Sequence, residues 1–170
     1  RLVPQKNLVM AINAFERVVK RYPDYVFEIY GDGPLKDELQ NYIMKRSLMN
    51  NVLLKGRSDN LYHDINRASG FILSSDYEGI SNSMIEAMAL GIPTISTDYP
   101  SGGARELIAS GVNGYLVSVG DSIQMSKYIC SIIEDEEHAV NIGKNAINIR
   151  QKLNVDVIMD KWMKYINSCI

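Results

Sequence analysis

Short apolar runs alternate along this chain with longer amphipathic stretches, and this alternation constrains the fold more than any other feature. The apolar runs predict strands at 25–31, 51–56, 70–75, 93–97 and 114–117. The amphipathic stretches predict helices at 5–21, 34–46, 59–67, 82–90, 103–109, 121–134, 136–150 and 154–168. Such alternation is typical of an α/β fold, here a Rossmann-like parallel sheet with helices on both faces. We expect one domain over residues 1–170 that ends in C-terminal helices.

The loops that follow the strands are the candidate binding elements, because parallel sheets bind ligands outside the carboxyl ends of their strands. One such loop opens the stretch SSDYEGISNSMIEAMALGIPTIST, residues 74–97. Glu78 lies in the loop, and Glu86 lies about one turn inside the helix that follows. The two carboxylates flank a helix N-terminus, where unpaired N–H groups and a partial positive charge favour a phosphate.

Small residues separate the two glutamates, as a ligand at this helix end would require. Gly79 would let a ligand approach the backbone closely, and Ser81 and Asn82 are short enough to cap the helix without blocking it. Carboxylates repel phosphate, so Glu78 and Glu86 should face hydroxyl groups instead. The pattern therefore suggests a sugar attached to a phosphate, with a ribose on the other side.

The same residues also fit a purely structural interpretation. Ser83-x-x-Glu86 is a capping-box pattern, in which the glutamate reaches back to the N–H of the cap residue. Glu78 would then be a solvated loop residue. Spacing alone leaves both interpretations open.

Two other groups could contribute to phosphate binding. Gly102 and Gly103 precede a short helix and offer either a second set of exposed amides or a plain turn. Arg1 and Lys6 flank the start of the first helix, where they could neutralise a diphosphate or could simply be solvated. The residues from Arg1 onward also resemble the end of a strand that leads into a helix, so we expect a piece of a longer protein.

Composition and motifs argue against several other functions. The net charge is −2 and basic residues are not clustered, so nucleic acid is not an expected partner. A G-x-x-x-x-G-K-[ST] motif is absent, which argues against a P-loop nucleotidase. Cys130 and Cys169 are too few for a disulfide framework or a zinc site. No apolar run approaches the roughly 20 residues of a membrane span, so a cytoplasmic location is the default expectation.

Several motifs together resemble the donor half of retaining glycosyltransferases of family 4, which have the GT-B fold. They are RLVPQKN, GDGPLKDEL, LKGRSDN, the stretch at residues 74–97 with its two glutamates eight apart, and PSGGARELI. The resemblance covers essentially all 170 residues in order. It implies transfer of a sugar, with a UDP-sugar as the expected donor and a polysaccharide or glycolipid as the expected acceptor. It also implies that no metal or other cofactor is required.

The resemblance implies catalytic roles for three residues. Arg1 and Lys6 match the basic pair that stabilises the leaving diphosphate, and Glu78 matches the residue that contacts hydroxyls of the transferred sugar. Asn7 replaces a common glycine, and Ser81 stands where proline is frequent. Both departures could shift the geometry of their loops.

Binding roles are implied for six further positions. The amides of Gly79, Ile80, Ser81 and Asn82 would hold the sugar and the distal phosphate. Glu86 would hold the ribose hydroxyls, and Arg57 lies in the turn expected beside the nucleotide base.

The family uses two domains that face each other across a cleft, so we expect this chain to lack an N-terminal acceptor domain. The isolated chain should then bind donor weakly and catalyse little. An apolar stripe on the last predicted helix fits core packing or docking of that missing domain; it comprises Met159, Trp162, Met163 and Ile166. The full-length protein could work at the inner membrane surface. The alternatives are a sugar-nucleotide epimerase of similar architecture and a non-catalytic nucleotide-sugar-binding module.

Overall fold

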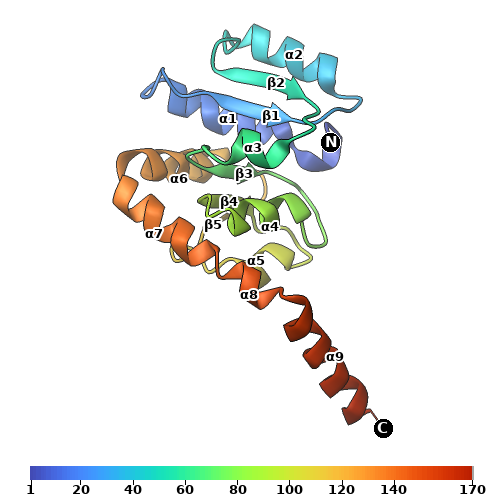
Figure 1. Ribbon diagram of the computed structural model, residues 1–170. Helices are drawn as coiled ribbons and strands as arrows, with labels where there is room; N and C mark the ends of the chain where they lie inside the picture. The colour runs from blue at the N-terminus through green and yellow to red at the C-terminus, as the bar shows by residue number, and fades with distance from the viewer. Residues whose placement is uncertain (170) are drawn as a thin grey trace.

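The computed structural model describes residues 1–169 and shows alternating strands and helices (Figure 1). The strands are β1 (Phe27–Tyr30), β2 (Val52–Gly56), β3 (Phe71–Leu73), β4 (Thr94–Thr97) and β5 (Tyr115–Val117). The helices are η1 (Pro4–Lys6), α1 (Leu8–Val19), α2 (Lys36–Lys45), α3 (Leu61–Ile65), α4 (Asn82–Ala89), α5 (Gly103–Leu107), α6 (Ser122–Glu134), α7 (Glu136–Ala146), α8 (Ile149–Lys152) and α9 (Val155–Ser168).

Every strand pair in the described chain is parallel. β1 pairs with β2, and β3, β4 and β5 pair in that order to form a second sheet. In the register, Ile29 lies opposite Leu54, and Ile72 lies opposite Ile95. The expected α/β class with parallel strands is confirmed, but the sheet comes in two parts, because β1 and β3 do not pair.

Helices cover the second sheet on both sides. All four residues of β4 are buried, as expected for a strand enclosed by helices. α4 packs against β3 and β4, and α6 packs against β4 and β5. One buried cluster joins α1, α2 and α6 to the strands, and a second joins α4, α5 and α8. The carboxyl ends of the strands are left to the loops that form the candidate site.

Two predicted helices are divided in the structure. The predicted helix 5–21 is interrupted at Asn7, whose φ of 40° ends the first short turn. The Asn7 side chain then accepts a hydrogen bond from the N–H of Met10 and so caps α1. The predicted helix 136–150 divides into α7 and α8. The strand positions agree with the prediction to within two residues at each end.

α9 extends away from the rest of the protein (Figure 1). None of its described residues is buried, and Met159, Trp162, Met163 and Ile166 are each about half exposed. Core packing was therefore the wrong interpretation of this apolar stripe, and docking of a further domain stays a prediction. No helix within residues 1–169 has the length and apolar character needed to cross a membrane.

Candidate functional site

The first seven residues lie across the carboxyl ends of β1 and β3. The N–H of Leu2 donates to the carbonyl of Asp32, just after β1, at 2.9 Å. On the other side, the N–H of Asp76 donates to the carbonyl of Gln5 at 2.9 Å, and Ser74 Oγ donates to the carbonyl of Lys6 at 2.8 Å. These bonds place Arg1 and Lys6 at the strand ends, where a ligand of this fold class binds.

The GDGP turn at residues 31–34 has a specific role in this placement. A Cβ added at Gly33 would lie 2.4 Å from the carbonyl oxygen of Leu2, so only glycine fits there. The N–H of Leu35 also donates to the Leu2 carbonyl, at 3.2 Å. The turn therefore holds the first residues against the end of β1, a role that a glycine pair in the sequence does not by itself reveal.

Lys6 and Glu78 form an ion pair at the centre of the site. Lys6 Nζ lies 2.5 Å from Glu78 Oε1, and Ser75 Oγ donates to the same oxygen at 2.9 Å. Only 19% of the Lys6 side chain and 13% of the Glu78 side chain are exposed. The Glu78 side chain is thus largely buried and is fixed by Lys6 and Ser75. The interpretation of Glu78 as a solvated loop residue is wrong.

Gln5 of η1 and Ser101, just before α5, hold the backbone around Glu78. Ser101 Oγ donates to the Glu78 carbonyl at 2.5 Å, and Gln5 Nε2 donates to the Tyr77 carbonyl at 2.8 Å. A Cβ added at Gly103 would lie 2.0 Å from the carbonyl oxygen of Gly79. Gly103 is therefore needed for close backbone packing. The sequence alone predicted no role for Gln5, Ser75 and Ser101, although all three lie within the motifs that carry the family resemblance.

The amino end of α4 has no side-chain cap. The N-cap residue is Ser81, which is buried and whose Oγ lies 3.1 Å from Ser83 Oγ. The predicted capping box is not formed, because the cap is not Ser83 and no side chain bonds to the cap backbone. Within residues 1–169, the N–H groups of Asn82, Ser83 and Met84 have no hydrogen-bond acceptor. Three donors are thus available at the position where the sequence predicts a phosphate.

A cavity of about 770 Å³ lies beside this helix end. Arg1, Lys6, Arg57 and Glu86 line its polar end, and its other charged lining residues are Glu28, Asp64 and Arg67. Arg1 and Arg57 are exposed and form no ion pair within residues 1–169. The site thus has an excess of positive charge, as a diphosphate would require.

Tyr99 lies beneath the loop and was not predicted to belong to the site. Its side chain is fully buried, and its hydroxyl has no hydrogen-bond partner in the described part of the chain. Burial, and then the negative charge of Glu78, raise the pKa of Tyr99. The nearby backbone of Ser81 lowers this pKa, but it does not form a hydrogen bond with the hydroxyl. A buried hydroxyl without a hydrogen-bond partner lowers the stability of the folded protein. Only the structure reveals this property of Tyr99.

The structure brings all the predicted site residues to one edge of the protein. Gly79, Ile80 and Asn82 are exposed around the amino end of α4, and Glu86 lies further along the same helix. Among residues 1–169 there is no group of three or more His, Cys, Asp or Glu residues that could hold a metal ion. The roles of these residues, and the independence from metal, stay predictions.

Comparison with known proteins gives matches over the whole chain. Residues 1–149 match the sequence model of a family described as "Glycosyl transferases group 1". The chain is 32% identical over 170 residues to the poly(glycerol-phosphate) alpha-glucosyltransferase of Bacillus subtilis. The matched region comprises 100% of this chain and 25% of that relative. The chain therefore spans about a quarter of the length of this relative.

Two solved structures are also similar. A variant of TarM from Staphylococcus aureus, in complex with fondaparinux, alpha-GlcNAc-glycerol and UDP, has a TM-score of 0.91 and 32% identity, over 96% of this chain and 33% of that one. HepE from Anabaena, in complex with UDP, has a TM-score of 0.88 and 27% identity, over 99% of this chain and 47% of that one.

Proposed function

This chain belongs to the glycosyl transferases group 1 family and has the fold of the C-terminal half of a GT-B glycosyltransferase, and from this premise we propose that it binds the donor of a retaining transferase. The donor is a UDP-sugar, and the acceptor is a glycan or a lipid-linked glycan. One observation carries the proposal. The uncapped amino end of α4 lies beside the Lys6–Glu78 ion pair at the carboxyl ends of the strands.

The diphosphate is bound by the cations and the helix end together. Lys6 and Arg1 neutralise the charge that develops on the leaving diphosphate, and this electrostatic stabilisation supplies most of the acceleration. In the free protein Lys6 is paired with Glu78. The diphosphate therefore competes with Glu78 for Lys6, and Glu78 becomes available to accept hydrogen bonds from hydroxyls of the sugar.

The backbone from Gly79 to Asn82 holds the sugar and the distal phosphate. A Cβ added at Gly79 would meet no atom within 4 Å, so the space beside it is open to a ligand. Ile80 is exposed, whereas Ser81 is buried and directs the chain into α4. Transfer takes place on the front face of the sugar, and the leaving phosphate helps to take the acceptor proton.

Glu86 and Arg57 bind the nucleoside. Within residues 1–169, the Glu86 carboxylate has no ion pair, so it is free to accept hydrogen bonds from the two ribose hydroxyls. Arg57 follows β2 and is exposed at the polar end of the same cavity, where it lies beside the base. The UDP in both similar structures supports a uridine nucleotide for this chain.

Isothermal titration calorimetry of the chain with UDP and UDP-sugars tests the proposal directly. We expect weak binding that EDTA does not change, because Lys6, Arg1 and the α4 amides take the place of a metal. If UDP and UDP-sugars all fail to bind at millimolar concentration, the donor site is wrongly assigned. If EDTA abolishes binding, the metal-independent part of the proposal is wrong.

The substitution Glu86→Ala tests the ribose contact. Loss of the carboxylate leaves polar groups of the ligand unpaired, so UDP binding should weaken by about 1–3 kcal/mol. Glu38→Ala is the matched control, since Glu38 is an exposed carboxylate on α2, away from the cavity residues. Equal affinities of the two variants for UDP would exclude the assigned role of Glu86.

Product analysis of the full-length protein separates transfer from the two alternatives. A glycosylated acceptor supports the transferase, and a free altered sugar nucleotide supports an epimerase. Binding of donor without transfer or hydrolysis would indicate a non-catalytic module. Acceptor binding is assigned to a second, N-terminal domain, for which the exposed apolar stripe of α9 offers a contact surface.

A further inference from the structure

Within residues 1–169, the Tyr99 hydroxyl is the only buried side-chain nitrogen or oxygen without a hydrogen-bond partner. The other buried hydroxyls each have one; they are those of Ser74, Ser75, Ser81, Thr94, Ser96, Thr97 and Ser126. Buried polar groups are nearly always paired, so an exception requires a specific explanation. The proposed function gives Tyr99 no role.

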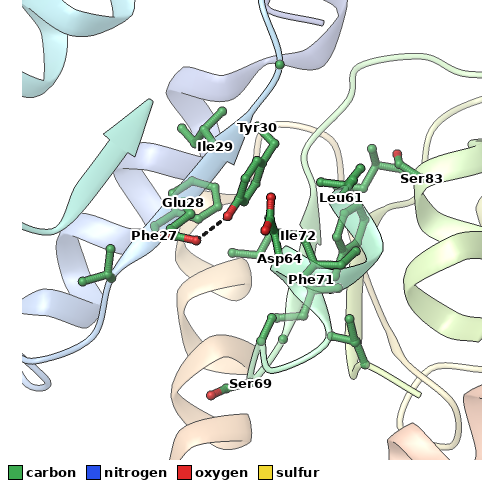
Figure 2. A pocket seen from close by; sticks show the side chains of 18 of the residues that line it. Phe27, Glu28, Ile29, Tyr30, Leu61, Asp64, Ser69, Phe71, Ile72 and Ser83 are labelled. Atoms are coloured by element: carbon green, nitrogen blue, oxygen red, sulfur yellow. Dashed lines mark hydrogen bonds between the residues drawn. The ribbon is translucent and has the colours of Figure 1, made fainter. Parts of the chain in front are cut away.

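The Tyr99 ring lies on the inner side of the amino end of α4. It belongs to a buried cluster with Leu73 of β3 and Met84 of α4. Ser83, the residue before Met84, lines the cavity that extends between β1 and β3 (Figure 2). The first turn of α4 thus has the cavity on one side and the cluster of Tyr99 on the other.

Tyr99 is also close to the loop that carries Glu78. Ser101, two residues after Tyr99, donates from Oγ to the Glu78 carbonyl at 2.5 Å. Burial, and then the charge of Glu78, raise the pKa of Tyr99, whereas the Ser81 backbone lowers it. Glu78 and Ser81 therefore both lie near the Tyr99 hydroxyl.

Both neighbours have hydrogen-bonding groups that the free protein does not use. Lys6 Nζ and Ser75 Oγ bond to Glu78 Oε1, and no group within residues 1–169 donates to Oε2. The N–H of Ser81 has no acceptor in the same part of the chain. A tyrosine hydroxyl can donate one hydrogen bond and accept another. A small shift of the loop would therefore give the Tyr99 hydroxyl two partners.

Binding of a diphosphate would create the need for this contact. In the proposed function the diphosphate takes Lys6 from Glu78, and Ser75 is then the one described residue that still donates to the carboxylate. Only 13% of the Glu78 side chain is exposed, so water cannot fully replace the lost ammonium group. A largely buried carboxylate needs hydrogen bonds, and Tyr99 has an unused donor on the protein side of the loop.

We propose that Tyr99 positions Glu78 in the donor-bound protein: its hydroxyl donates to the carboxylate once the diphosphate has taken Lys6, and it accepts the N–H of Ser81. This inference rests on the proposed function. Tyr99 acts through Glu78 and touches no substrate, so it is a positioning residue. Its hydroxyl lacks a partner in the free protein because that partner becomes available only when the donor binds.

Isothermal titration calorimetry of Tyr99→Phe with UDP and with uridine tests this role. Uridine lacks the diphosphate, so it leaves Lys6 paired with Glu78. We expect Tyr99→Phe to weaken UDP binding about 5- to 10-fold, the effect of one lost hydrogen bond, and to leave uridine binding unchanged.

Tyr115→Phe is the matched control. It also removes a buried tyrosine hydroxyl, one that lies 3.0 Å from His138 Nε2. Tyr115 is the first residue of β5, at the opposite end of the strand from the site, so its loss should leave UDP affinity unchanged.

The same comparison in a Glu78→Ala background isolates the contact between the two side chains. Without the carboxylate, Tyr99→Phe should change UDP affinity less than about two-fold, because the hydroxyl no longer has a carboxylate to position. Urea unfolding separates this effect from damage to the fold, since Tyr99→Phe should be no less stable than the wild-type protein.

Three results would overturn the role of Tyr99 in a wild-type protein that binds UDP. They are unchanged UDP affinity in Tyr99→Phe, equal weakening of uridine binding, and an undiminished effect in the Glu78→Ala background. Lower stability of Tyr99→Phe would also overturn it, since the hydroxyl would then have a partner in the free protein. A wild-type protein that does not bind UDP would instead overturn the proposed function, and the role of Tyr99 with it.

Discussion

Two buried hydroxyl groups beside the candidate site differ in whether they have a hydrogen-bond partner. Thr97 Oγ1 donates to the carbonyl of Ser75 at 2.6 Å, directly beneath the loop that carries Glu78. The Tyr99 hydroxyl, two residues further on, has no partner within the described residues. Because an unsatisfied buried group costs free energy and a satisfied one does not, the two positions should respond in opposite ways to loss of the hydroxyl.

We expect Thr97→Val to lower the free energy of unfolding by about 1–3 kcal/mol, because the Ser75 carbonyl loses its donor. Tyr99→Phe removes only an unpartnered oxygen and should leave the free energy of unfolding unchanged or raise it by about 1 kcal/mol. Urea unfolding followed by circular dichroism measures both. A loss in Tyr99→Phe as large as in Thr97→Val would mean that the Tyr99 hydroxyl has a partner after all.

Asn7 shows why a departure from the family pattern need not disturb the site. Its backbone lies in the left-handed region, with φ 40° and ψ 49°, which glycine adopts freely and asparagine tolerates. Its side chain caps α1 at Met10 and also donates from Nδ2 to Asp76 Oδ1 at 2.6 Å. Asparagine thus keeps the turn that a glycine would make and adds a bond to the loop before Glu78.

The start of α5 contacts the backbone of the loop before α4. Gly103 begins α5, and its Cα lies so close to the Gly79 carbonyl that a side chain has no room. Ser101, just before α5, bonds to the Glu78 carbonyl. The position of the loop that carries Glu78 therefore depends on a helix that carries none of the proposed site residues.

Gly103→Ala should displace this loop, because the added Cβ would lie 2.0 Å from the Gly79 oxygen. We expect a loss of about 1–3 kcal/mol in the free energy of unfolding, together with weaker UDP binding. Gly79→Ala is the steric control for stability, since its Cβ meets nothing within 4 Å and should change unfolding by less than about 0.5 kcal/mol. Equal stability of the two variants in urea unfolding would contradict the contact.

α9 should contribute little to the stability of the isolated chain. Truncation after Asn154 removes a helix with no buried residue, so we expect a change of less than about 1 kcal/mol. Truncation after Ala146 also removes Ile149, which is buried in the cluster around α4, and should cost about 2–5 kcal/mol. Thermal and urea unfolding of the two truncations provide the comparison. A large loss in the free energy of unfolding on truncation after Asn154 would show that α9 packs on the rest of the chain.

The charge of the protein is unevenly distributed between its surface and the site. The net charge is −2, yet Arg1, Lys6 and Arg57 gather at one end of one cavity. An overall acidic protein with a local cationic site attracts a small anion without a general affinity for polyanions such as nucleic acid. The binding of UDP should therefore depend on the ionic strength.

Raising NaCl from about 0.05 M to about 0.5 M should weaken UDP binding several-fold, because salt screens the interaction of the diphosphate with the exposed Arg1 and Arg57. Uridine, which lacks the phosphates, is the matched control ligand and should bind with an affinity that salt hardly changes. Calorimetric titrations at the two salt concentrations give both values. The same salt dependence for UDP and uridine would contradict a cationic diphosphate site.

Much of the fold was predictable because local patterns determine strands and helices. The apolar runs gave the five strands of the described chain near their observed positions, and the alternation with helices gave the parallel class. The break at Asn7 was missed because it depends on one φ angle. Lys6 and Glu78 lie beside each other because of the order of the strands. No pattern within either segment predicts this contact, since 72 residues separate the two.

The amino-acid sequence by itself determined the class of fold, the family and the identity of the candidate residues, because periodicity and motif spacing are local properties of the chain. Only the tertiary structure decided that Lys6 pairs with Glu78, that α4 begins without a side-chain cap, that Tyr99 has an unpartnered hydroxyl and that β1 and β3 leave a cleft between them. Each of these depends on distances between segments far apart in the chain, and such distances are set by packing and by the pairing of backbone groups.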